Sequence, residues 1–104
     1  MQKFTKDRQA FQVLPIEYVS DITIGDTTPT VLNCKLFTLV NIAPLSITYF
    51  NDGAEGQTIR LLGDGVTTVV HGASLKTNTG ANKLLLANII YTFTLINGVW
   101  YENE

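Results

Sequence analysis

The sequence contains few of the residues that mark a disulfide scaffold, a metal site or a membrane span. Its single cysteine, Cys34, cannot form a disulfide within the chain, which excludes a disulfide-rich secreted domain. Cys34 and the single histidine, His71, are too few for a zinc site. No apolar run approaches the ~18 residues of a membrane-spanning helix, and the first residues lack the apolar core of a signal peptide. We therefore expect no membrane insertion.

Charge is also scarce. Charged residues make up 15% of the 104 residues, against roughly 25% in an average soluble domain, while apolar residues make up 45%. The net charge of −2 gives no electrostatic reason to expect nucleic acid as a partner. Because a small domain has much surface to solvate, the low charge suggests that part of the surface contacts another chain. A neutral monomer rich in Thr and Asn is the alternative.

The residue pattern predicts strands throughout the chain. Short segments rich in Val, Ile, Thr, Tyr and Phe alternate with Gly, Asn, Asp or Pro, which are typical of turns. We expect strands at Glu17–Ile24, Thr30–Asn33, Leu36–Asn41, Ser46–Phe50, Gln57–Leu62, Val66–Val70, Lys83–Ala87, Ile89–Ile96 and Val99–Glu102.

Strands this short and this numerous predict an all-β fold, a two-sheet antiparallel sandwich with a jelly-roll-like order. The sandwich would occupy residues 17–104. Residues 1–16 have mixed charge and few turn signals, so we expect them to be a connector from something upstream. One helical alternative exists, a turn near Leu84–Asn88, although the β-branched residues that follow favour a strand.

Three glycine-containing segments are typical of hairpin turns. Asn51-Asp52-Gly53, Gly63-Asp64-Gly65 and Asn97-Gly98 all carry residues that accept a positive φ. The last of these would place Trp100 and Tyr101 on the final strand. Adjacent residues of a strand face opposite sides of a sheet, so the two rings cannot form one platform and one of them points into the sandwich.

Few side chains suggest catalysis. Ser74 follows His71 by three residues, but no motif of a nucleophile surrounds it. Asp52, Glu55 and Asp64 could hold calcium or act as an acid–base pair, yet an aspartate beside a glycine is the ordinary occupant of a turn. We therefore expect no catalytic, cofactor-binding or metal-binding residues.

Two sets of residues are candidates for contacts with other molecules. Aromatic rings with polar neighbours suit sugars, which favours Tyr101, Asn97 and Glu102 as ligand-binding residues. The second set is expected in the core or in an interface between chains, and the pattern does not separate these two roles. It consists of Leu84, Leu86, Tyr91, Phe93 and Trp100.

The succession of segments over about residues 21–102, in which three motifs are the most telling, resembles a module of bacteriophage tail spikes and tail appendages, of the preneck-appendage and pectate-lyase-like kinds. The motifs are Gly56-Gln57-Thr58-Ile59-Arg60-Leu61, the D-G-x-T-T-x-x-H-G run at Asp64–Gly72, and Gly98-Val99-Trp100-Tyr101-Glu102. Such modules commonly follow a β-helix. Each motif is weak alone, and their order and spacing carry the resemblance.

The resemblance implies a homotrimeric adhesin domain of the virion tail. It would attach to a bacterial surface polysaccharide such as teichoic acid, and any cleavage of that glycan would belong to an upstream β-helix. It implies no cofactor and no catalytic residue in this chain. Two other functions stay open: a monomeric carbohydrate-binding module of a bacterial enzyme, and an enzyme that processes itself or hydrolyses polysaccharide.

Overall fold

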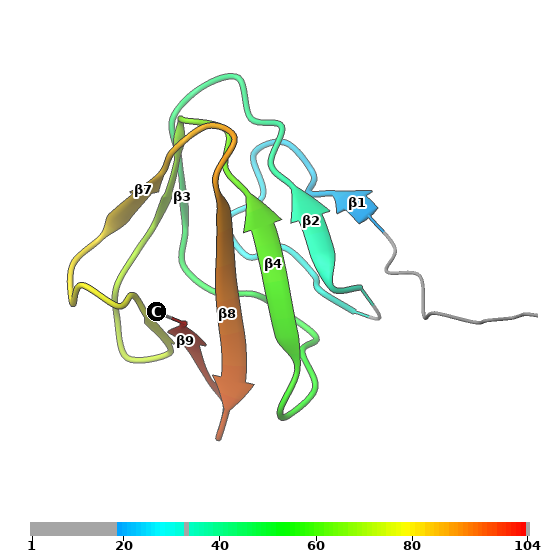
Figure 1. Ribbon diagram of the computed structural model, residues 1–104, viewed down its shortest axis with the longest axis vertical. Helices are drawn as coiled ribbons and strands as arrows, with labels where there is room; N and C mark the ends of the chain where they lie inside the picture. Colours follow the sequence, from blue (N-terminus) through cyan, green and yellow to red (C-terminus); the bar gives the residue numbers. More distant parts are fainter. Residues whose placement is uncertain (1–18, 33, 104) are drawn as a thin grey trace, which may run out of the picture.

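The computed structural model describes residues 19–32 and 34–103, which form nine strands and no helix (Figure 1). The all-β class is therefore confirmed for this part of the chain. The connector predicted at residues 1–16 lies outside the described residues. In chain order the strands are β1 (Val19–Asp21), β2 (Leu36–Thr38), β3 (Leu45–Ile47), β4 (Thr58–Leu62), β5 (Thr67–Val69), β6 (Leu75–Lys76), β7 (Lys83–Leu85), β8 (Ile90–Ile96) and β9 (Val99–Glu102).

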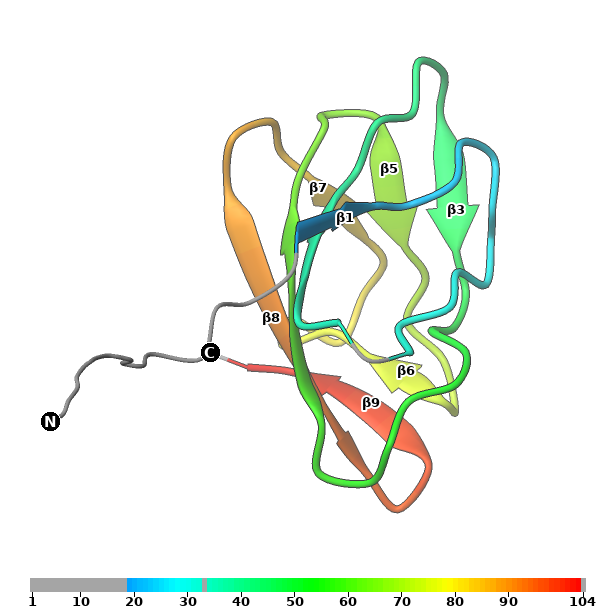
Figure 2. The same cartoon turned by 90° about the vertical axis from the view of Figure 1, so that its right-hand side faces the viewer.

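Two sheets enclose the core from opposite sides (Figure 2). The larger sheet has six strands in the order β1-β2-β4-β8-β9-β6, and the smaller has three in the order β3-β5-β7. From β2 to β5 the chain alternates between the sheets, so that β4 lies beside β2 and β5 lies beside β3. A hairpin of β8 and β9 then extends the larger sheet, and β7 extends the smaller one.

The prediction of antiparallel sheets is wrong for four of the seven strand pairs in the described part of the chain. The pairs β1–β2, β2–β4, β3–β5 and β6–β9 are parallel. Parallel neighbours need a crossover connection, and the crossovers from β2 to β4 and from β3 to β5 each pass through the opposite sheet. These mixed pairings do not confirm a jelly-roll-like order.

The same crossovers correct two of the three turn predictions. Asn51-Asp52-Gly53 joins β3 to β4, and Gly63-Asp64-Gly65 joins β4 to β5, so both segments connect strands of different sheets and neither is a hairpin. A turn motif shows that the chain bends but does not show which sheet it enters next. The third prediction is confirmed: Asn97-Gly98 joins the antiparallel strands β8 and β9, with φ angles of 52° and 77°.

Several strand boundaries also differ from the predicted ones. In the described part of Thr30–Asn33 a single bridge forms, from Thr30 to Asn51, in place of a strand. The short strand β6 was not predicted, because two residues carry no readable alternation. The helical turn near Leu84–Asn88 is not adopted: β7 runs to Leu85, and Asn88 follows in a turn with a φ of 66°.

Trp100 organises the centre of the core. Its side chain is fully buried, its Nε1–H donates to the carbonyl oxygen of Phe50 at 2.9 Å, and its ring meets that of Phe50 edge-on at 5.5 Å. A Cβ on Gly53 would lie 2.5 Å from the Trp100 ring, so the glycine leaves room for the indole. The other buried hydrophobic side chains are Ile22, Val31, Cys34, Phe37, Leu39, Ile47, Phe50, Ile59, Leu61, Val69, Leu75, Leu85, Phe93 and Leu95.

Candidate functional site

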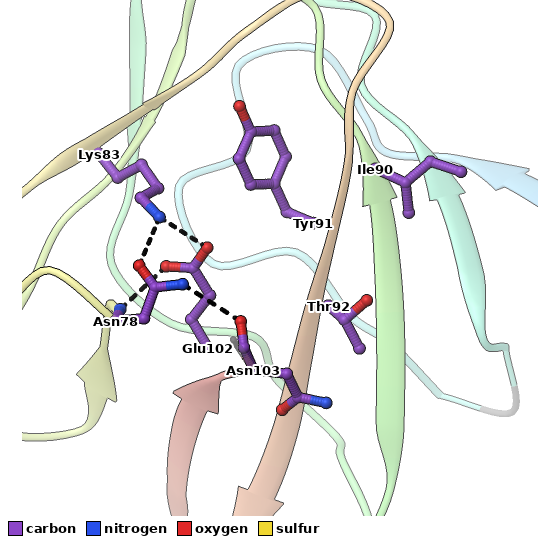
Figure 3. Close-up of a pocket in the computed structure, with 7 residues that line it drawn as sticks. All are labelled: Asn78, Lys83, Ile90, Tyr91, Thr92, Glu102 and Asn103. Atoms are coloured by element: carbon purple, nitrogen blue, oxygen red, sulfur yellow. Dashed lines mark hydrogen bonds and ion pairs between the residues drawn. The ribbon is translucent and has the colours of Figure 1, made fainter.

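A polar pocket of about 420 Å³ opens beside the end of β9 (Figure 3). It lies where β7 of the smaller sheet and β8 of the larger sheet form neighbouring walls, with the loop from β6 to β7 below them. The residues that line it are Asn78, Lys83, Ile90, Tyr91, Thr92, Glu102 and Asn103.

An ion pair between Lys83 and Glu102 forms one wall of the pocket. The Lys83 Nζ lies 2.8 Å from the Glu102 Oε2, and the two side chains are 20% and 4% exposed. The other carboxylate oxygen, Oε1, accepts the backbone N–H of Asn78 at 3.0 Å. The carboxylate is therefore held in one orientation, with each of its oxygens engaged.

Asn78 links this ion pair to the end of the chain. Its side-chain oxygen accepts from the Lys83 ammonium at 2.7 Å, and its side-chain Nδ2 donates to the carbonyl oxygen of Asn103 at 3.2 Å. One amide thus contacts both a positive side chain and a backbone carbonyl. These contacts fix the position of the Asn78 side chain although the residue is exposed.

The loop that carries Asn78 is anchored by its buried neighbour. The Thr77 hydroxyl donates to the carbonyl oxygen of Ala81 at 2.5 Å, and the Thr77 N–H donates to the Nδ1 of His71 at 3.1 Å. His71 lies in the connection from β5 to β6, two residues after the end of β5. The imidazole of His71 therefore holds the loop in place through Thr77, and His71 itself does not line the pocket.

The ring of Tyr91 forms the aromatic wall. The Lys83 Nζ lies 5.9 Å from the ring centroid, which is within the range of a cation–π contact. The hydroxyl oxygen accepts the backbone N–H of Leu86 at 2.9 Å, so the ring is tied to the turn that precedes β8. Half-buried against the core, the ring has a fixed position.

The edge of β8 completes the pocket because β9 is the shorter strand. The last residue of β9, Glu102, pairs with Phe93, and the next residue donates from its N–H to the carbonyl oxygen of Thr92 at 2.8 Å. Backbone groups two residues apart on a strand point the same way, so the N–H and C=O of Ile90 face the side that β9 would occupy. No strand in the described part of the chain pairs with Ile90 on that side.

The polar groups of the pocket are unequally satisfied. The acceptor atoms Glu102 Oε1, Glu102 Oε2, Asn78 Oδ1 and the Asn103 carbonyl oxygen each accept a hydrogen bond. Several donor hydrogens of the lining residues have no acceptor among the described residues: the third of the Lys83 ammonium, the second of the Asn78 amide, those of the Tyr91 and Thr92 hydroxyls and those of the Asn103 side-chain amide. The pocket therefore offers donors to a ligand.

The structure does not bring the three predicted ligand-binding residues together. Glu102 lines the pocket, whereas Tyr101 lies on the opposite face of β9, 40% exposed, beside Thr94. Asn97 lies in the turn at the other end of β9, and its N–H donates to the Glu55 carboxylate. Sequence reasoning missed the other pocket residues. The one signal that could have pointed to them is the polar loop Thr77–Asn82, which the sequence marks as exposed.

The residues predicted for the core or an interface divide into three groups. Phe93 and Trp100 lie in the core, fully buried. Tyr91 packs against the core and also lines the pocket. Leu84 and Leu86 lie outside the core, 46% and 51% exposed, so the core role is wrong for them and the contact with another chain stays a prediction.

The acidic residues predicted as a possible calcium site each accept hydrogen bonds in a different turn or loop. Asp52 accepts from the hydroxyl of Thr30 at 2.6 Å, and Glu55 accepts from the hairpin turn at Asn97 and Gly98. Among residues 19–32 and 34–103, no three His, Cys, Asp or Glu side chains lie together as a metal site would require. The same part of the chain has no helix long and apolar enough to cross a membrane.

Asp64 shows what such a carboxylate does in its turn. Burial by itself would raise the pKa of Asp64, but hydrogen bonds to the charged form outweigh it, and the pKa lies below its ordinary value of 3.8. The donors are the N–H of Val66 at 3.0 Å, the N–H and hydroxyl of Thr67 at 2.9 and 2.8 Å, and the N–H of Asn41 at 3.1 Å. Asp64 therefore holds the connection from β4 to β5 in place.

Comparison with known proteins adds no relative to this picture. No known family matches the sequence, and no curated protein or solved structure is similar to the chain. The likeness to phage tail appendages thus rests on the three sequence motifs.

Proposed function

We propose that this chain is a non-catalytic module of a bacteriophage tail spike or appendage, which attaches the virion to a bacterial surface polysaccharide such as teichoic acid. The motif resemblance supplies the setting. The pocket at the Lys83–Glu102 ion pair supports the binding role and is the observation on which the proposal mainly depends.

The pocket has the properties that sugar recognition requires. Sugars present many hydroxyl and carbonyl acceptors together with apolar C–H faces, and they are bound by fixed polar groups next to an aromatic ring. Here the donors of Lys83 and Asn78 are held by internal hydrogen bonds, and the Tyr91 ring lies beside them. Since these groups are already ordered, binding a ligand would cost little side-chain entropy.

Assembly into a homotrimer is the second part of the proposal. The segment from β7 to β8 exposes four large apolar side chains, which we term the β7–β8 apolar cluster: Leu84, Leu86, Ile89 and Ile90. Each of the four is 45–53% exposed, which supports a contact with another chain. Three copies of a weak sugar site would bind a repetitive polysaccharide far more tightly than one copy.

A monomeric carbohydrate-binding module is the alternative function. One observation favours it: a single copy of the chain already supplies an aromatic ring, that of Tyr91, beside the polar donors of Lys83 and Asn78. Sedimentation velocity separates the two functions, because the trimer would have three times the 11.5 kDa mass of the chain. A monomer that still binds sugar would favour the alternative.

Binding of the intact chain to purified bacterial surface polysaccharides tests the proposal. We expect binding that is lost in Asn78→Ala, which removes a pocket amide, and kept in Tyr101→Ala, which removes the exposed ring on the other face of β9. The opposite pattern would move the site to that outer face. Absence of binding to a panel of wall and capsular polysaccharides would contradict the proposal.

A further inference from the structure

We infer that the pocket prefers a sugar residue that carries an acetamido group over sugars that carry only hydroxyl groups and over acidic sugars. The inference rests on the proposed function, because it concerns which sugar of a polysaccharide occupies this pocket. Three features of the pocket support it: its free donors, its balanced charge and its apolar wall.

The free donors call for a strong acceptor. Lys83 Nζ and the Asn78 side-chain oxygen are 2.7 Å apart, so the free hydrogens of the ammonium and of the amide belong to neighbouring groups. A carbonyl oxygen has two lone pairs and accepts from two such donors at once. A sugar hydroxyl group also accepts, but its oxygen is a weaker hydrogen-bond acceptor than the carbonyl oxygen of an amide.

The charge balance disfavours an acidic sugar. The Lys83 ammonium already lies 2.8 Å from the Glu102 carboxylate. A carboxylate or phosphate of a ligand at this ammonium would therefore face a second negative charge, and it would also lose its hydration. A neutral carbonyl accepts from the same ammonium without this repulsion.

The remaining walls suit the rest of an acetamido group. The Tyr91 ring, which points to the same side of β8 as the Lys83 ammonium, offers apolar surface to a methyl group (Figure 3). The backbone carbonyl of Ile90 faces the side of β8 on which no described strand pairs, where it can accept the acetamido N–H. A hydroxyl-only sugar has neither the methyl group nor this N–H.

Calorimetric titration of the intact chain with three matched tetrasaccharides tests the inference. The three are built of N-acetylglucosamine, of glucose and of glucuronic acid, with the same linkage. We expect the acetamido ligand to bind roughly fivefold to tenfold more tightly than the glucose ligand, which corresponds to about one good hydrogen bond. The glucuronate ligand should bind more weakly still. Equal or tighter binding of either competitor would overturn the inference.

A pair of substitutions in one loop locates the preference. Asn78→Asp keeps an oxygen for Lys83 but removes the amide donor, so the ratio between the acetamido and glucose affinities should fall towards one. Asn82→Asp changes the charge equally outside the pocket, keeps its oxygen for the His71 N–H, and should leave the ratio unchanged. Loss of the ratio in both variants, or in neither, would contradict the assignment of the amide. Trp100 fluorescence verifies that both variants are folded.

The two proposals fail in different ways. If the wall and capsular polysaccharides and all three tetrasaccharides fail to bind, the proposed function itself is wrong. If a polysaccharide binds but the three tetrasaccharides bind equally, the function stands and the acetamido preference is wrong.

Discussion

Replacing Lys83 with methionine should destabilise the fold by about 3 kcal/mol, because the nearly buried Glu102 carboxylate would lose its counter-ion. The Glu102 side chain is 4% exposed, and its remaining partner in the described part of the chain would be the Asn78 N–H. Removing one partner of a buried ion pair costs about 3–5 kcal/mol. Lys83 is 20% exposed, so water reaches the vacated side and the lower end of this range applies.

The partner substitution should behave differently. Glu102→Gln should cost about 1–2 kcal/mol, because Lys83 keeps the Asn78 oxygen and contact with water. The double variant should be more stable than Lys83→Met alone, since it no longer contains an unpaired buried carboxylate. We expect a coupling free energy of about 1–2 kcal/mol between the two positions.

Urea unfolding followed by fluorescence measures these differences. The sequence has one tryptophan, and Trp100 is fully buried, so its emission reports on the core. The wild-type protein and the three variants should unfold with the same dependence on urea and with different midpoints. A Lys83→Met protein within about 0.5 kcal/mol of wild type would refute the reasoning, because that is the behaviour of an exposed ion pair.

Three further predictions concern a turn, the core and assembly. Folding lowers the pKa of Asp64, so its carboxylate stabilises the folded protein fully above the ordinary value of 3.8, and this contribution is lost as the pH falls through the lower folded value. Between about pH 5 and pH 2, urea titrations should therefore show a smaller loss of unfolding free energy for Asp64→Asn than for the wild-type protein. Gly53→Ala should lower the free energy of unfolding by about 1–3 kcal/mol, because the new methyl group would overlap the Trp100 ring. Gly72→Ala has no atom within 4 Å of its new methyl group and should change the unfolding midpoint little. Equal effects of the two substitutions would contradict this expectation. Leu86→Lys should convert a trimer to monomers in sedimentation velocity and leave the unfolding of the monomer unchanged, and a wild-type protein that sediments as a monomer would refute the trimer.

The end of the chain was the part most readable from the sequence. Asn97-Gly98 accepts the positive φ of a two-residue hairpin turn, and this requirement is local. The alternation of a strand then sends Trp100 into the core and Tyr101 outward, as the structure has them. Such features depend on a few neighbouring residues and can be read without the rest of the fold.

The sheet pairing and the pocket depend on contacts that are distant in the sequence. Gly63-Asp64-Gly65 bends the chain equally well into a hairpin or across to the other sheet, and parallel packing of β3 beside β5 decides between them. In the pocket, the backbone N–H of Asn78 donates to the side chain of Glu102, and these two groups meet only after the larger sheet has formed. The residues next to Asn78 and next to Glu102 in the sequence do not predict that the two side chains lie in one pocket.

The most direct test of the carbohydrate-binding pocket is a titration of the isotope-labelled intact protein with a bacterial surface polysaccharide, or with the acetamido tetrasaccharide, followed by the backbone amide signals in nuclear magnetic resonance. We expect the largest shifts on residues that line the pocket, with Asn78, Lys83 and Tyr91 foremost. Shifts confined to the outer face around Tyr101 and Lys76, or no shifts with any of these ligands, would contradict this expectation.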